Sequence, residues 1–167
     1  MHTPDSSGQT LLPTGATGAA ACLIIGVGNR GRGDDALGPA LIEQLQALEL
    51  AGVELLEVFQ LQVEHCLDLQ GRRQVVFADA SLQGTAPYAF EPLRPAARVG
   101  ALSHALAPAQ LLALYRQLYG EPPPAHVLAM RGYDFTPGAA LSDAARRHLH
   151  AAVDFLVHWL APDRLAG

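Results

Sequence analysis

The stretch that decides the fold is ACLIIGVGNRGRGDDALGPALIEQL, residues 21–45. It opens with a short apolar run followed by glycines, which predicts a strand buried on both faces of a sheet. After a loop rich in glycine and arginine, leucines recur at helical spacing from Asp35 onward, which predicts an amphipathic helix that ends before Gly52. Asp34 stands where the N-cap of this helix would be. A buried strand, a glycine-rich turn and a helix in this order predict an α/β fold.

Apolar strands and amphipathic helices alternate along the rest of the chain. Further strands are predicted at 53–59, 74–80, 87–93 and 125–130, and helices at 63–69, 108–119 and 142–160. Prolines flank the 87–93 strand, which favours an edge position. We therefore expect an α/β protein, a three-layer α/β/α sandwich with a mostly parallel five-stranded sheet and one edge strand. A single domain is predicted over residues 21–162, after a flexible tail over residues 1–20 that is rich in Ser, Thr, Gly and Pro.

Composition excludes several classes of protein. Half of the 167 residues are hydrophobic and 16% are charged, which excludes a disordered chain. The net charge is −5 and every basic residue is a scattered arginine, so no basic face is predicted for a nucleic acid. No apolar stretch reaches the ~20 residues that span a bilayer, and no basic residue precedes Arg30 as in a secretory signal. We expect a cytoplasmic monomer without membrane or nucleic-acid partners, in which Cys22 and Cys66 are buried as small apolar side chains.

The glycine-rich loop matches the dinucleotide-binding fingerprint, because residues 26–31 have the spacing Gly-x-Gly-x-x-Gly between a predicted strand and a predicted helix. Glu57, at the end of the next strand, stands where an acid would bind a ribose. Against this interpretation, the carboxylates of Asp34 and Asp35 occupy the start of the helix, where they would repel a pyrophosphate. A Rossmann-like dinucleotide-binding protein is therefore only an alternative.

A longer pattern over the same loop is more specific. Residues 26–38 read Gly-x-Gly-Asn-x4-Asp-Asp-x2-Gly, and this resembles the first motif of the [NiFe]-hydrogenase maturation endopeptidases. The segment Phe-Ala-Asp-Ala at 77–80 resembles the second acidic motif of that family, and Ser-His at 103–104 resembles its histidine motif. The three motifs occur in the family's order, and the resemblance extends over nearly all of residues 23–160.

The resemblance implies a peptidase that removes a C-terminal extension from the hydrogenase large-subunit precursor after nickel insertion. It implies that Asp35, Asp79 and His104 are the catalytic residues and that they also engage the nickel, which the precursor supplies; no organic cofactor is implied. Two positions depart from the family pattern. Residues 57–61 replace the usual Asp-Gly-Gly-Thr segment and resemble the branch that serves soluble NAD-reducing hydrogenases, and Asp35 stands where many members have Glu.

The residues themselves also predict a site. Asp35 follows the first strand, Asp79 lies at the carboxyl end of the third, and His104 lies on a loop expected to return to the same edge. In an open α/β sheet, ligands bind at this edge, near a change of strand direction. Two carboxylates and an imidazole within about 5 Å of one another suit a divalent metal such as nickel, zinc or manganese.

No serine or cysteine nucleophile motif occurs, so a peptidase of this kind would use an activated water. The sequence leaves open whether a metal or a carboxylate activates that water. A second hypothesis also stays open: a non-enzymatic binding module, or chaperone, that senses nickel in the precursor and leaves cleavage to another protein.

The 57–64 segment follows the second strand and is expected beside the site. Phe59 either fills the core or contacts a partner, whereas Gln60 and Gln62 are harder to place in a core. We expect this segment to help select the cognate large subunit without taking part in the chemistry.

Overall fold

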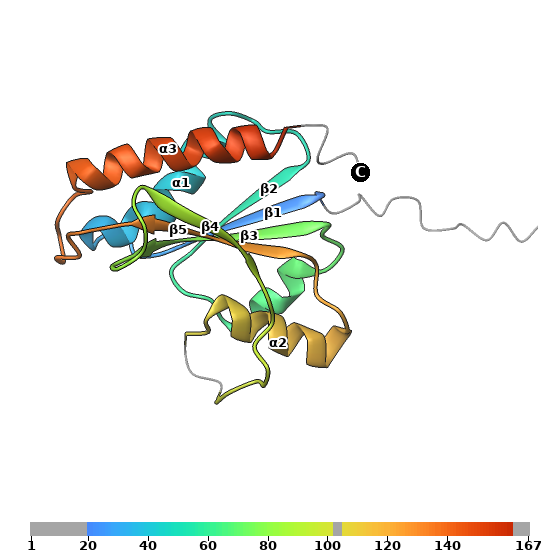
Figure 1. Cartoon of the computed structure of the whole chain (residues 1–167). Helices are drawn as coiled ribbons and strands as arrows, with labels where there is room; N and C mark the ends of the chain where they lie inside the picture. Colours follow the sequence, from blue (N-terminus) through green and yellow to red (C-terminus); the bar gives the residue numbers. More distant parts are fainter. Residues whose placement is uncertain (1–19, 102–104, 162–167) are drawn as a thin grey trace, which may run out of the picture.

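The computed structural model describes residues 20–101 and 105–161, and Figure 1 shows their arrangement. The elements, in chain order, are β1 (Cys22–Val27), the 3₁₀ helix η1 (Gly33–Ala36), α1 (Leu37–Gln46), β2 (Val53–Val58), the 3₁₀ helix η2 (Val63–Leu69), β3 (Gln74–Ser81), β4 (Tyr88–Leu93), α2 (Pro108–Tyr119), β5 (Ala125–Arg131) and α3 (Asp143–Trp159). The apolar pattern predicts all five strands to within a residue or two. The expected tail over residues 1–20 lies, apart from Ala20, outside the described residues.

The five strands form one sheet in the order β2-β1-β3-β5-β4. The first four of these are parallel to one another, and β4 runs antiparallel to β5 at the edge. The edge position of β4 confirms the prediction from its prolines, since Pro92 cannot donate a hydrogen bond to a second neighbour. The chain leaves β1 for β2 on one side and returns to β3 on the other, so the strand order reverses at β1.

Helices cover both faces of the sheet, which confirms the predicted three-layer sandwich (Figure 1). α1 and α3 pack on one face, over a core that includes Cys22, Ile24 and Leu128. α2 and η2 pack on the other face, over a core that includes Cys66 and Phe77. Both cysteines are buried, as predicted. None of the described helices is both long enough and apolar enough to cross a membrane.

Two glycines let α1 lie directly against β1. A Cβ atom added at Gly26 would clash with the carbonyl oxygen of Gly38, and one added at Gly38 would clash with the backbone of Val27. The loop between them also needs glycine, because Gly28 has φ +149° and a Cβ there would clash with the carbonyl of Asp35. Close packing of a strand and a helix therefore accounts for most of the glycine pattern that resembles a dinucleotide fingerprint.

Gly38→Ala is expected to destabilise the fold by about 1–3 kcal/mol, because the added methyl group pushes α1 away from β1. The matched control is Gly31→Ala, where the nearest atom to an added Cβ is Asn29 Oδ1 at 3.4 Å. Urea unfolding followed by circular dichroism measures both variants. Equal stability of the two variants would show that α1 and β1 are not in contact through Gly38.

The prediction that Asp34 is the N-cap of α1 is wrong. The helix starts at Leu37, after the turn η1, and its N-cap residue Ala36 makes no side-chain hydrogen bond. The Asp34 carboxylate is instead fully buried against the β5–α3 connection. Its Oδ2 accepts hydrogen bonds from the backbone N–H groups of Tyr133 (2.7 Å) and Asp134 (3.0 Å).

Ser142, the N-cap residue of α3, completes the set of partners around Asp34. Its N–H donates to Asp34 Oδ1 over 2.7 Å, and its hydroxyl donates to Asp34 Oδ2 over 2.8 Å. Burial alone would raise the pKa of Asp34, but the hydrogen bonds from the backbone and from Ser142 outweigh it and hold the pKa below its usual value. Asp34 thus joins the β1–α1 loop to the start of α3 as an ionised group.

Candidate active site

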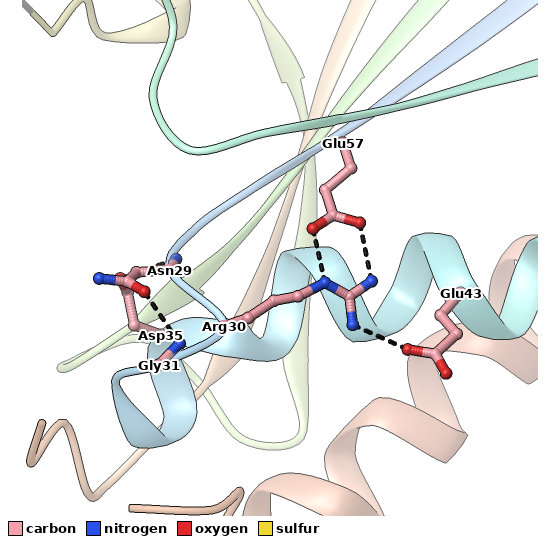
Figure 2. Close-up of polar contacts among 6 residues, drawn as sticks. All are labelled: Asn29, Arg30, Gly31, Asp35, Glu43 and Glu57. Atoms are coloured by element: carbon pink, nitrogen blue, oxygen red, sulfur yellow. Dashed lines mark hydrogen bonds and ion pairs between the residues drawn. The ribbon is translucent and has the colours of Figure 1, made fainter. Parts of the chain in front are cut away.

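Asp35 lies in η1, in the connection between β1 and α1 at the carboxyl edge of the sheet. Its Oδ2 accepts a hydrogen bond of 3.0 Å from the backbone N–H of Asn29, and Asn29 Oδ1 accepts one of 2.9 Å from the N–H of Gly31 (Figure 2). Asn29 therefore closes the loop on itself and fixes one oxygen of Asp35. Within the described part of the chain, no donor contacts the other oxygen, Oδ1, which is available to a ligand.

Arg30 holds the same loop from the outside. Its Nε and Nη2 donate to the two carboxylate oxygens of Glu57 over 2.6 and 2.7 Å, and its Nη1 donates to Glu43 Oε2 over 2.9 Å (Figure 2). The two parallel hydrogen bonds between Arg30 and Glu57 fix the orientation of the guanidinium group, and they lower the pKa of Glu57. The loop is thereby tied to the end of β2 and to α1. The carboxylate expected to bind a ribose in a dinucleotide-binding protein is thus engaged by an arginine.

Asp79 lies near the end of β3, the strand next to β1, on the face covered by α2. Burial raises its pKa to about 6; the backbone N–H of Ala80, which donates to Asp79 Oδ1 over 2.7 Å, opposes the rise, and the charge of Asp35 adds to it. A carboxyl group whose pKa lies near neutrality is suited to accept and release protons, as a general base or acid must.

Asp35 and Asp79 thus lie at the edge where the strand order reverses, the place where open α/β sheets bind ligands. The charge of Asp35 contributes to the raised pKa of Asp79. His104, the third residue of the predicted site, lies outside the described residues. Among residues 20–101 and 105–161, no three His, Cys, Asp or Glu side chains are grouped so that they could hold a metal ion. The site formed by Asp35, Asp79 and His104 therefore stays a prediction.

A cleft of about 380 Å³ opens beside Asp79. It lies over the carboxyl ends of β1, β3 and β5 and is bounded by the first residues of α2. An apolar hollow next to a buried carboxyl group is a common form of ligand-binding site.

Sequence-based reasoning missed the roles of Asn29 and Arg30, which act on Asp35 through the loop. One signal was available for Arg30. It directly follows β1, and Glu57 lies in β2, so an arginine and a glutamate stand at the same edge of two neighbouring parallel strands. Opposite charges placed in this way are expected to pair.

The 57–64 segment leaves β2 beside this edge and exposes an aromatic ring. The side chain of Phe59 is 65% exposed, so the alternative that it fills the core is wrong. The core position belongs to Leu61, which is 2% exposed. Val63 is also exposed, and Gln62 begins η2, where its backbone N–H donates to Nδ1 of His65 over 2.8 Å. Phe59 and Val63 are therefore free to contact another molecule.

No protein-family model matches the sequence, and no curated protein matches it. Several solved structures do match. The hydrogenase maturating endopeptidase HybD from E. coli aligns with a TM-score of 0.67 and 22% identity, over 83% of this chain and 91% of that one. The [NiFe] hydrogenase maturation protease HycI from Thermococcus kodakarensis aligns with a TM-score of 0.67 and 21% identity, over 86% and 94% of the two chains.

A third match is the hydrogenase 2 maturation peptidase of a Thaumarchaeota archaeon, with a TM-score of 0.61, 22% identity, and coverage of 84% of this chain and 97% of that one. The chain is thus an α/β protein with the fold of the hydrogenase maturation endopeptidases. The match spans nearly the full length of each of these structures, which confirms the fold expected from the sequence motifs.

Proposed function

We propose that this chain is an endopeptidase that removes the C-terminal extension from the nickel-loaded large-subunit precursor of a [NiFe] hydrogenase. The observation that carries the proposal is that Asp35 and Asp79 both lie at the carboxyl edge of this particular fold, where the charge of Asp35 helps to raise the pKa of Asp79. Both residues also fall in the two acidic motifs that resemble those of the maturation endopeptidases. The sequence resemblance and the structural likeness therefore support the same function independently.

Hydrolysis of a peptide bond requires a nucleophilic water and a group that takes its proton. The nickel arrives with the precursor and supplies Lewis acidity to the reacting groups when bound. Asp79 suits the role of proton acceptor, and Asp35 offers Oδ1 to the metal centre of the precursor. The water oxygen bonds to the carbonyl carbon, the C–N bond breaks, and the proton passes to the leaving amine. His104 completes the ligands in this proposal.

The decisive experiment mixes the purified chain with nickel-loaded and with nickel-free precursor and follows shortening of the precursor on a gel. Cleavage of the loaded precursor alone supports the proposal. Binding of the loaded precursor without cleavage would favour the second hypothesis, a nickel-sensing binding module. Equal cleavage of both precursors would contradict the role proposed for nickel.

We propose that the precursor binds the 57–64 segment, and Phe59 provides a test of this contact. Because the ring is mostly exposed, Phe59→Ala is expected to leave the free energy of unfolding nearly unchanged. An apolar side chain buried in an interface is worth about 1.5–3 kcal/mol, so the Kd for the precursor is expected to rise about 10- to 100-fold. Surface plasmon resonance with the nickel-loaded precursor measures the change.

The control for this prediction is Leu48→Ala, at an exposed apolar position after α1. It is expected to leave both the Kd and the turnover of saturating precursor unchanged. Loss of turnover by Phe59→Ala at saturating precursor, with an unchanged Kd, would assign the residue to catalysis instead of recognition.

A further inference from the structure

Within residues 20–101 and 105–161, the α2 face of the sheet is incompletely covered near the site. β1, β3 and β5 are interior strands, and their apolar side chains are buried toward the amino ends, as Ile25 and Val75 are. Toward the carboxyl ends, however, Val27, Val127 and Ala129 on the same face are only half-buried. Interior strands of a three-layer sandwich are normally covered on both faces. This uncovered part of the sheet is the floor of the cleft beside Asp79.

The described residues that form the walls of the cleft are mostly apolar. Leu93 of β4 and Pro108 of α2 line the sides. The hydroxyl of Ser81 accepts a hydrogen bond of 2.9 Å from the N–H of Gly84. Among the described residues of the lining, Asp79 alone is charged, and it belongs to the proposed site. A charged or amide side chain placed in the cleft would lose its hydration and gain few partners, whereas an apolar side chain would lose nothing.

We infer that this cleft is a specificity subsite that receives one apolar side chain of the precursor, from a residue next to the bond that is cut; this inference rests on the function proposed above. The volume of about 380 Å³ lies at the low end for small-molecule sites, which suits a single side chain and not a helix or strand of the partner. Consecutive Cα atoms are about 3.8 Å apart, so a peptide whose carbonyl group reaches Asp79 places a neighbouring side chain within reach of the cleft.

Ala129 and Leu93 set the size of the subsite in this inference. Ala129 is the register partner of Asp79 on the neighbouring strand, so a larger side chain there enters the cleft directly beside the carboxyl group. Leu93 lines the cleft from the end of β4, where it pairs with Ala125 at the start of β5. Ala129→Leu narrows the cleft, and Leu93→Ala widens it.

The test combines these variants with altered precursors, each nickel-loaded and each carrying Gly in place of one residue next to the cut. Ala129→Leu is expected to cleave the unaltered precursor with a kcat/KM about 10- to 100-fold below that of the unmodified enzyme. One of the Gly precursors is expected to restore kcat/KM to within about threefold. Ala51→Leu, at an exposed position outside the cleft, is the matched control and is expected to cleave every precursor as the unmodified enzyme does.

The outcomes separate this inference from the proposed function. If the unmodified enzyme cleaves no nickel-loaded precursor, the proposed function itself is wrong. If it cleaves the precursor, but no Gly substitution restores the activity of a folded Ala129→Leu enzyme, the subsite is wrong. If Ala129→Leu does not fold, Leu93→Ala decides the question. Leu93→Ala is expected to cleave a precursor that carries Phe next to the cut about 10-fold better than the unmodified enzyme does. Equal cleavage of that precursor by the two enzymes would overturn the inference.

Discussion

Asp79→Asn is expected to abolish cleavage of the precursor and, at the same time, to make the folded protein more stable at pH 7. Loss of a proton acceptor costs about 10²- to 10⁴-fold in rate. The gain in stability follows from burial, which raises the pKa of Asp79 from 3.8 to about 6, so that keeping this group ionised in the folded protein is unfavourable. The cost reaches about 3 kcal/mol at neutral pH, and an uncharged amide removes it.

The pH dependence of this stabilisation has a definite sign. Between pH 4 and pH 6 the folded protein binds the proton of Asp79 more tightly than the unfolded chain does, so the unmodified protein gains stability as the pH falls through 6. The advantage of Asp79→Asn is therefore largest above pH 6 and disappears near pH 4. Urea unfolding at several pH values, together with a gel assay of cleavage, measures both effects.

Asp154→Asn is the matched control, because Asp154 is an exposed acid on α3, away from the carboxyl edge. It is expected to change neither activity nor the pH dependence of unfolding. An Asp79→Asn enzyme that retains full activity would remove Asp79 from the site, whatever its effect on stability.

Asp34→Ala is expected to have the largest effect on the free energy of unfolding, a loss of about 3–5 kcal/mol. The substitution leaves the N–H groups of Tyr133, Asp134 and Ser142 without the acceptor that they share. Asp34→Asn is expected to lose somewhat less, because one oxygen remains to accept. Chemical denaturation compares both variants with Asp154→Ala, whose effect is expected to stay within about 0.5 kcal/mol. A small loss for Asp34→Ala would show that the β5–α3 connection is held mainly by other contacts.

The stabilisation that Asp34 provides depends on its ionised state and is therefore lost at acid pH. Its pKa in the folded protein is lowered below the ordinary value of 3.8. The stabilisation is therefore complete above pH 4 and is lost as the pH falls through the lower, folded-state pKa. Asp34 and Asp79 thus respond oppositely to acid, although burial acts on both carboxyl groups. Among the described residues, Asp34 has several hydrogen-bond donors and Asp79 has one.

The strands, the edge position of β4 and the amphipathic helices could be predicted because each depends on a local pattern of apolar residues, glycines or prolines. The placement of Asp35 and Asp79 at one edge of the sheet could be predicted too, since the carboxyl ends of parallel strands share one edge. Their convergence with His104 stays a prediction. The role of Asp34 could not be predicted. Its donors lie 99 to 108 residues away along the chain, and most are backbone N–H groups, which any residue type supplies.

The exposure of Phe59 could not be predicted from the sequence either. Phe59 and Leu61 are both apolar and both follow β2, and the alternation that separates core from surface positions ends with the strand. In the structure, Leu61 turns inward and Phe59 remains exposed, because the chain bends toward η2 after Val58. No periodic pattern describes such a bend.

The two acidic residues and the exposed ring of Phe59 lie on separate segments at one edge of the sheet, and this separation has an evolutionary consequence. The carboxylates stand on strand ends and on a loop tied down by Asn29 and Arg30, whereas the exposed ring of Phe59 belongs to a connection that contributes nothing to the sheet. Substitutions at the exposed positions Phe59 and Val63 can therefore accumulate without disturbing Asp35 or Asp79. Glu57, which pairs with Arg30, and the buried Leu61 are constrained. A gene duplicate could acquire a new binding partner by drift at these exposed positions alone, and the same separation makes them the natural place to graft side chains from another protein of this fold.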